Sequence, residues 1–153
     1  MAIRQKPFVT LKLLGTCTSP TRTEVSARDV GVIIDEPLPR GGTNSGPTPT
    51  ETLMAALAGC ANVITHKIAE SHGVNILDLS IEIEALLDRR GVTLAEELDV
   101  PFPTVTQRIR IVTDASDGDV EKIKRDLPRF CPVSKVISQS GTVLTTEWTV
   151  ERP

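Results

Sequence analysis

The segment GGTNSGPTPTETLMAALAGC, residues 41–60, decides the fold of this chain. Its first half belongs to a loop, because residues 35–49 contain four prolines and three glycines. A helix then begins with clear signals. Thr48 is a good N-cap, Pro49 suits the first helical position, and Glu51 completes a T-x-x-E capping box. The segment therefore predicts a rigid turn-rich loop that leads directly into a helix.

The predicted helix ends at Gly73 and is apolar on nearly every face. Large apolar residues recur at intervals of three and four, at Leu53, Leu57, Cys60, Ile64 and Ile68. Alanines and Met54 occupy much of the remaining surface. Glycine inside a helix costs about 1 kcal/mol relative to alanine, so Gly59 predicts the close approach of another element. We expect a central helix with protein around most of it.

The rest of the chain predicts strands and two shorter helices. Extended patterns predict strands within residues 8–14, 22–34, 76–87, 105–113 and 143–150. Helices are expected from Ser116 to Pro128 and from Cys131 to Gly141. The length of 153 residues is that of one ordinary domain, which we place at residues 1–153.

Composition and charge disfavour several classes of function. The apolar fraction of 39% and the charged fraction of 24% are those of a globular protein, which argues against disorder. A net charge of −3 gives no electrostatic footprint for nucleic acid or an anionic membrane. The N-terminus lacks the apolar core of a signal peptide. We therefore expect a cytoplasmic protein that binds neither nucleic acid nor membrane.

The cysteines are three in number and widely spaced, at Cys17, Cys60 and Cys131. In a reducing compartment this pattern is not a disulfide framework. No C-x-x-C motif occurs, and His66 and His72 do not share a helical face, so we expect no metal site. The thiols are therefore buried apolar groups or redox-active groups, and Cys17 has no context that favours a role.

Cys131 has the most informative position of the three. As the N-cap of a helix with Pro132 in its first turn, its sulfur would face unpaired N–H groups that stabilise a thiolate. A small apolar filler would fit the same position equally well. Cys60, on the expected core face of the central helix, would by itself be a structural residue more often than a reactive one.

Residues 41–60 together with the C-P-V motif at residues 131–133 resemble the OsmC-like superfamily. This superfamily includes OsmC proper, the organic hydroperoxide resistance proteins and a YhfA-like group, to which the loop is most similar. The resemblance covers essentially the whole chain. It implies an α+β fold in which antiparallel sheets wrap a central helix, an intertwined homodimer with sites at its interface, and no cofactor.

The resemblance also implies roles for individual residues. In the catalytic branches the helix cysteine is peroxidatic and the C-P-V cysteine resolves it, roles that match Cys60 and Cys131. The family's glutamate matches Glu51 and holds an arginine that polarises the peroxide. By loop position that arginine matches Arg40, with Arg22 as the second candidate. The implied activity is reduction of organic hydroperoxides in stress defence, with a lipoyl or other dithiol as reductant. The alternative is a non-catalytic dimer that binds a small ligand or senses redox state.

Overall fold

The computed structural model describes residues 7–153, which divide into two compact units, one ending at Thr52 and the other covering Leu53–Pro153. The elements are β1 (Leu14–Cys17), β2 (Thr23–Ala27), β3 (Val30–Ile34), the 3₁₀ helix η1 (Leu38–Arg40), α1 (Pro49–Ser71), β4 (Asp78–Leu86), β5 (Thr104–Val112), α2 (Asp117–Phe130), α3 (Pro132–Gln139) and β6 (Val143–Glu151). The single domain at residues 1–153 stays a prediction.

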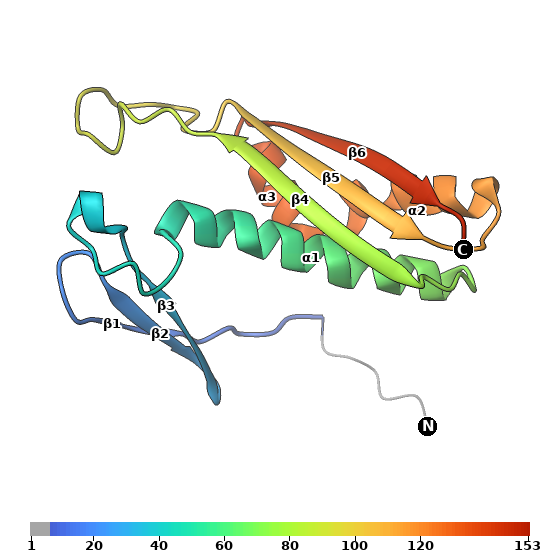
Figure 1. Ribbon diagram of the computed structural model, residues 1–153, viewed down its shortest axis with the longest axis horizontal. Coiled ribbons are helices and arrows are strands. Elements are labelled where there is room, and N and C mark those ends of the chain that lie inside the picture. The colour runs from blue at the N-terminus through green and yellow to red at the C-terminus, as the bar shows by residue number, and fades with distance from the viewer. Residues whose placement is uncertain (1–6) are drawn as a thin grey trace. The chain divides into compact units, whose positions relative to one another are not determined.

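The first unit contains a three-stranded antiparallel meander in the order β1-β2-β3 (Figure 1). The strand predicted at residues 8–14 is wrong in position, because β1 begins only at Leu14, where its pairing with Ser26 of β2 starts. Residues 15–17, which no predicted strand included, belong to β1, and the chain turns after Cys17. Alternation alone could not locate the strand, since a strand also needs a partner for its backbone groups.

Asp35 organises the glycine-rich loop that follows β3. Its carboxylate is fully buried and accepts hydrogen bonds from the Thr43 hydroxyl (2.5 Å) and from the N–H groups of Thr43 (2.9 Å) and Ser45 (3.1 Å). A Cβ atom at Gly46 would lie 2.1 Å from the carbonyl oxygen of Ile33, so only glycine fits there. The loop before α1 is therefore held in one conformation.

The Asp35 contacts predict a response of this loop to acid. Hydrogen bonds from Thr43, Ser45 and Glu36 outweigh the burial of the carboxyl group and lower the pKa of Asp35 to about 2. Because the pKa is depressed in the folded state, the stabilisation is present above about pH 4 and is lost as the pH falls through 2. We expect Asp35→Asn to accelerate amide hydrogen exchange at Thr43 and Ser45 near neutral pH.

Hydrogen exchange followed by NMR measures this effect residue by residue. Asp29→Asn, in the exposed turn between β2 and β3, is the matched control and should leave exchange in the loop unchanged. Equal exchange rates at Thr43 and Ser45 in the Asp35→Asn variant and the unmodified protein would show that the carboxylate does not hold the loop.

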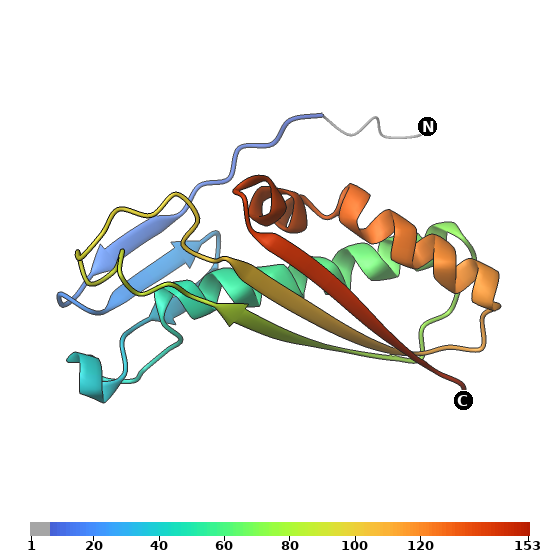
Figure 2. The ribbon, with the colours of Figure 1, turned by 90° about the horizontal axis from the view of Figure 1, so that it is seen from above.

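The second unit packs its helices on one face of a mixed three-stranded sheet (Figures 1 and 2). β4 pairs with β5 in antiparallel orientation, as expected, but β6 runs parallel to β5, which the sequence analysis did not anticipate. The connection explains the difference, since α2 and α3 lie between β5 and β6 and provide the long crossover that a parallel pair requires.

The core of this unit lies between the sheet and the helices. Its buried members are Ala61, Ile68, Ala69, Ile109, Ile111, Val120, Ile123, Leu127 and Cys131. A smaller cluster of Leu57, Val105 and Ile137 packs beside it. α2 continues two residues past Pro128, its expected end, because a proline in the last turn removes a single hydrogen bond and the N–H of Cys131 still reaches the Leu127 carbonyl (2.9 Å).

α1 has one buried face rather than the nearly complete cover that its composition predicted. The buried residues are Leu57, Ala61, Thr65, Ile68 and Ala69. This face is offset by one position from the predicted one, because the short side chains of Ala61 and Thr65 allow close packing. Cys60 and Ile64 consequently lie half-buried at its edge. A Cβ at Gly59 would meet no atom within 4 Å in the described part of one chain, so the close approach predicted there is wrong within the chain.

By length and composition alone, α1 could cross a membrane. Its most apolar window of 18 residues has a mean hydropathy of 1.2, and 28% of that window is buried. The core helix of a soluble protein meets the same criterion, so these values do not distinguish a membrane-spanning helix from a core helix. Two large apolar side chains of α1 are exposed in one chain, Leu53 to 40% and Val63 to 49%.

Candidate functional site

Cys60 and Cys131 meet in the second unit, although 71 residues separate them. Cys60 is half-buried on α1, Cys131 is fully buried between α2 and α3, and both are free thiols. Their sulfur atoms lie 3.0 Å apart, with the Cys131 thiol donating to the Cys60 sulfur. A disulfide needs about 2.05 Å, so a small movement closes the bond. The structure thus brings together the two thiols that the resemblance paired.

The first turn of α3 offers a backbone N–H group to each sulfur. Cys131 is the N-cap of α3, as predicted, with Pro132 in the first turn. The N–H of Ser134 donates to the sulfur of Cys131 (3.5 Å), and the N–H of Val133 is hydrogen-bonded to the sulfur of Cys60. Free N–H groups at a helix start carry partial positive charge. This end of α3 therefore favours negative charge on the sulfur pair.

Burial opposes that effect at Cys60. It raises the pKa of the Cys60 thiol above its usual range, and the neighbouring Cys131 thiol acts in the same direction, whereas the Val133 N–H lowers it. The net direction is upward, so Cys60 is mainly a neutral thiol at neutral pH in this environment. A thiolate is the nucleophile in thiol chemistry, and a nearby positive charge would be needed to stabilise it.

Glu51 and Arg40 lie in the first unit. The Glu51 carboxylate closes the predicted capping box by accepting from the N–H (2.8 Å) and the hydroxyl (2.9 Å) of Thr48. These bonds lower the pKa of Glu51, and the charge of Arg40 lowers it further. The guanidinium of Arg40 forms its ion pair with Glu36 (2.6 Å), so its influence on Glu51 within one chain is electrostatic rather than a direct ion pair.

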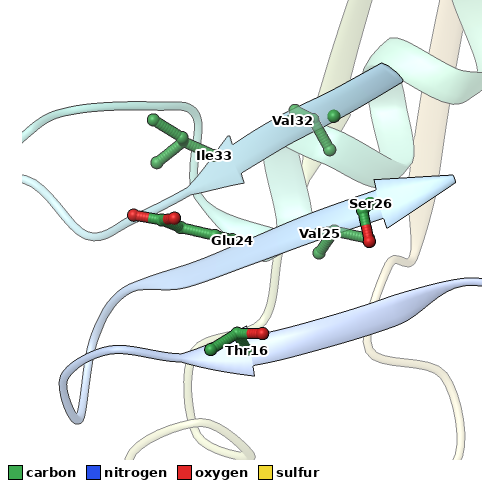
Figure 3. A pocket seen from close by; sticks show the side chains of 7 residues that line it. Thr16, Glu24, Val25, Ser26, Val32 and Ile33 are labelled. Carbon is green, nitrogen blue, oxygen red and sulfur yellow. The ribbon is translucent and has the colours of Figure 1, made fainter. Parts of the chain in front are cut away.

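Arg22, the second candidate cation, also has a carboxylate partner in the first unit. It pairs with Glu24 (2.9 Å) and donates to the Ser45 hydroxyl (3.3 Å). Figure 3 shows the hollow on the β1–β3 sheet that Glu24 lines, with a volume of about 340 Å³. Cys17 is exposed on β1, where the Thr23 hydroxyl donates to its sulfur. The residues that line the hollow include no cysteine, which makes the sulfur pair of the second unit the stronger candidate site.

Two polar residues near the sulfur pair were missed by the sequence analysis. Gln107 occupies a core-facing position of β5 between Val105 and Ile109, and Ser134 lies in the first turn of α3; both are buried. The alternating pattern of β5 contained the signal for Gln107, since a polar residue stands where the period of two calls for an apolar one. Within residues 7–153, no group of three or more His, Cys, Asp or Glu residues is placed to hold a metal ion.

Comparison with known proteins identifies the family. The sequence pattern of the family described as OsmC-like protein matches residues 42–147, more than half of the chain. The chain belongs to the OsmC-like family. No curated protein sequence matches this OsmC-like protein.

Solved structures share its fold. An OsmC-like protein of Mycoplasma pneumoniae has a TM-score of 0.79 at 13% identity, covering 94% of this chain and 98% of that one. The organic hydroperoxide resistance protein OsmC of Legionella pneumophila has a TM-score of 0.67 at 17% identity, with coverages of 95% and 99%. The organic hydroperoxide resistance protein OhrB of Bacillus subtilis has a TM-score of 0.60 at 16% identity, with coverages of 92% and 98%. At such identities the likeness establishes the α+β OsmC-like fold.

Proposed function

We propose that this OsmC-like protein reduces organic hydroperoxides, with Cys60 as the peroxidatic thiol and Cys131 as the resolving thiol. The observation that carries the proposal is the 3.0 Å contact between two free thiols at the start of α3. Family membership supports it, as do fold relatives whose names refer to organic hydroperoxide resistance. The expected site of action is the cytoplasm, where a reducing environment keeps both thiols available.

The chemistry balances with these two residues and an external dithiol. The Cys60 thiolate attacks the distal oxygen of ROOH, the O–O bond breaks, and the alkoxide leaves as ROH after taking up a proton. Cys60 is then a sulfenic acid. The Cys131 thiol displaces its hydroxyl group, forming the disulfide and releasing water. A dithiol reductant, which we take to be of the lipoyl type, receives the disulfide by exchange and restores both thiols.

The surroundings of Cys60 favour an organic substituent on the peroxide. Ile64 lies one turn further along α1, and beyond it an apolar hollow of about 340 Å³ is lined by Ile64, Lys67, Ile68, Ser71 and Phe130. Such a surface removes an alkyl or aryl group from water, whereas hydrogen peroxide gains nothing from it. We therefore assign the substrates to the class of organic hydroperoxides.

The decisive experiment is mass spectrometry after stoichiometric cumene hydroperoxide. We expect loss of two hydrogens from the protein and a crosslinked peptide that joins Cys60 to Cys131. The Cys131→Ser variant should instead stop at a Cys60 sulfenic acid, which dimedone traps. Unmodified thiols after peroxide treatment would contradict the proposal.

A non-catalytic dimer that binds a small ligand or senses redox state is the second candidate. The raised pKa of Cys60 favours the ligand-binding form, because a neutral thiol reacts slowly with peroxide. Turnover distinguishes the two. A reductase consumes many equivalents of cumene hydroperoxide when dihydrolipoamide is supplied, a sensor consumes about one equivalent and stays oxidised, and a dimer that only binds a ligand consumes none.

The uncovered surface of α1 supports a homodimer. On α1, Val63 is 49% exposed, and Phe130, which lines a hollow together with Ile64 and Ile68 of α1, is 60% exposed. Apolar residues of this size are normally covered when they occur in one region. A second copy of the chain offers the same apolar region in return, as an isologous interface requires. We propose an obligate homodimer with an interface above roughly 2,000 Å².

The dimer predicts an outcome for a charge placed on α1. Val63→Glu should shift the protein from dimer to monomer at micromolar concentration in light scattering, because the interface would bury an unpaired carboxylate. Leu94→Glu is the matched control, since Leu94 is 93% exposed at a loop tip and the substitution should leave the mass unchanged. A monomeric unmodified protein, or a dimer that tolerates Val63→Glu, would contradict this interface.

A further inference from the structure

A small cavity lies behind the turn that carries Cys131. Its volume is about 80 Å³, and its lining combines the polar side chains of Gln107, Ser134, Ser138 and Thr146 with apolar side chains that include Leu127. These residues come from β5, β6, α2 and α3, so the cavity lies where the sheet meets the α2–α3 corner. None of its lining residues carries a charge.

Two residues that line this cavity each carry a buried polar atom with no protein partner among residues 7–153. The side-chain nitrogen of Gln107 donates to the Thr146 hydroxyl (3.2 Å), but its Oε1 accepts no hydrogen bond. The Ser134 hydroxyl is also unpaired. Gln107 is 1% exposed and Ser134 is 3% exposed, so bulk water does not form hydrogen bonds with these two polar atoms. Exchanging the two amide atoms of Gln107 would still leave one polar atom in the cavity.

We propose that this cavity is a binding site for ordered water, held by Gln107 and Ser134. The carbonyl oxygen of Gln107 can only accept, so the ligand must donate a hydrogen bond, and the Ser134 hydroxyl can complete the pair. A buried water needs about 10–15 Å³ of accessible volume and two to four polar partners, and the cavity supplies both. A charged ligand is disfavoured, since no counter-charge lines the cavity to offset its desolvation.

The bound water would position the Cys131 thiol. Ser134 lines the cavity, its hydroxyl has no protein partner among the described residues, and its backbone N–H donates to the sulfur of Cys131 (3.5 Å). Leu127, another lining residue, accepts the backbone N–H of Cys131 (2.9 Å). Water that links Ser134 to Gln107 thus ties the first turn of α3 to the central strand of the sheet. Gln107 is accordingly a positioning residue for Cys131, and only its relevance to peroxide turnover rests on the proposed function.

The water itself is tested by a high-resolution crystal structure of the unmodified protein. We expect density within hydrogen-bond distance of both the Gln107 amide and the Ser134 hydroxyl. A cavity without such density would overturn the proposal. This measurement does not depend on any variant or on peroxidase activity.

The positioning role is tested by the rate at which diamide closes the Cys60–Cys131 disulfide. Diamide takes two electrons and two protons from a thiol pair and becomes the hydrazine, so no peroxide is involved. Gln107→Leu removes both polar atoms at similar volume, and we expect closure to slow about tenfold, because small misplacements of reacting groups have large kinetic effects. Thr106→Val, on the opposite face of β5, is the control and should close at the unmodified rate.

Two further readouts separate positioning from general destabilisation. Ser134→Ala should slow disulfide closure to a similar extent. The thermal unfolding midpoint of each variant should stay well above the temperature of the assay. Unchanged closure in both folded variants would overturn the positioning role. If Gln107→Leu does not fold, the Ser134→Ala rate decides the question. Normal diamide closure combined with no reaction toward cumene hydroperoxide would count against the proposed function instead.

Discussion

Replacing Cys60 with serine is expected to lower the rate constant for cumene hydroperoxide reduction by about 10³-fold or more. The serine hydroxyl is not ionised near neutral pH, and loss of a nucleophile removes the covalent step itself. The fold should survive, because Cys60 is only half-buried at the edge of the α1 contact and serine is nearly the same size. Stopped-flow measurement of a single turnover, with the reduced protein mixed with peroxide in the absence of dithiol, gives the rate constant directly.

Two companion variants make the Cys60 result interpretable. Cys131→Ser should keep a first peroxide reaction at Cys60 but lose turnover, with progressive oxidation of Cys60 to the sulfinic form. Cys17→Ser, whose thiol is exposed on β1, should leave all rates unchanged. Peroxide turnover that persists in Cys60→Ser would remove Cys60 from the mechanism, and an effect of Cys17→Ser would add an unforeseen thiol to it.

Local signals predicted the secondary structure around the site well. The capping box of Thr48 and Glu51 forms as the sequence indicated, and Cys131 caps α3 ahead of Pro132. Both depend on residues within one turn of each other, so the sequence contains all the necessary information. The pairing of Cys60 with Cys131 spans 71 residues and was available only through resemblance to a family.

The predictions that were wrong depend on tertiary context. The alternation within residues 8–14 did not reveal that β1 would start at Leu14, because the partner strand decides where pairing begins. The buried face of α1 is offset from the predicted face because Ala61 and Thr65 pack closely, and hydrophobicity alone ranks Cys60 and Ile64 above them. Whether Gly59 packs against anything depends on atoms outside a single chain.

The half-buried position of Cys60 at the edge of the α1 contact bears on its chemistry. A cysteine on the fully buried face of α1 would be inaccessible to a peroxide, whereas Cys60 is only half-buried and its sulfur accepts a hydrogen bond from the Cys131 thiol. Partial burial still raises the pKa of the thiol, so accessibility and thiolate formation oppose each other at this residue. A nearby cation would stabilise the thiolate and so lower the pKa of Cys60 without burying the sulfur further.

We expect Arg40 to supply that charge. Its loop leads directly into α1, and its charge already acts on Glu51 in the first turn of the helix that carries Cys60. Arg40→Ala should lower the rate constant for peroxide reduction by about 10²-fold, equivalent to about 2.7 kcal/mol of transition-state stabilisation. Because the cation favours the thiolate, its removal should also raise the pH at which Cys60 reacts with iodoacetamide at half its maximal rate.

The Arg22→Ala variant is the matched comparison, since both side chains pair with a glutamate in the first unit of one chain. Truncating the arginine that stabilises the Cys60 thiolate should slow peroxide reduction and also raise the pH at which Cys60 reacts with iodoacetamide at half its maximal rate. Truncating the other arginine should change neither quantity. A rate loss confined to Arg22→Ala would transfer the role to Arg22. If neither variant changes the rate or the profile, the pKa of Cys60 stays high without a compensating charge. The protein would then react slowly with peroxide, and the non-catalytic alternative, a dimer that binds a small ligand, would be the better description of its function.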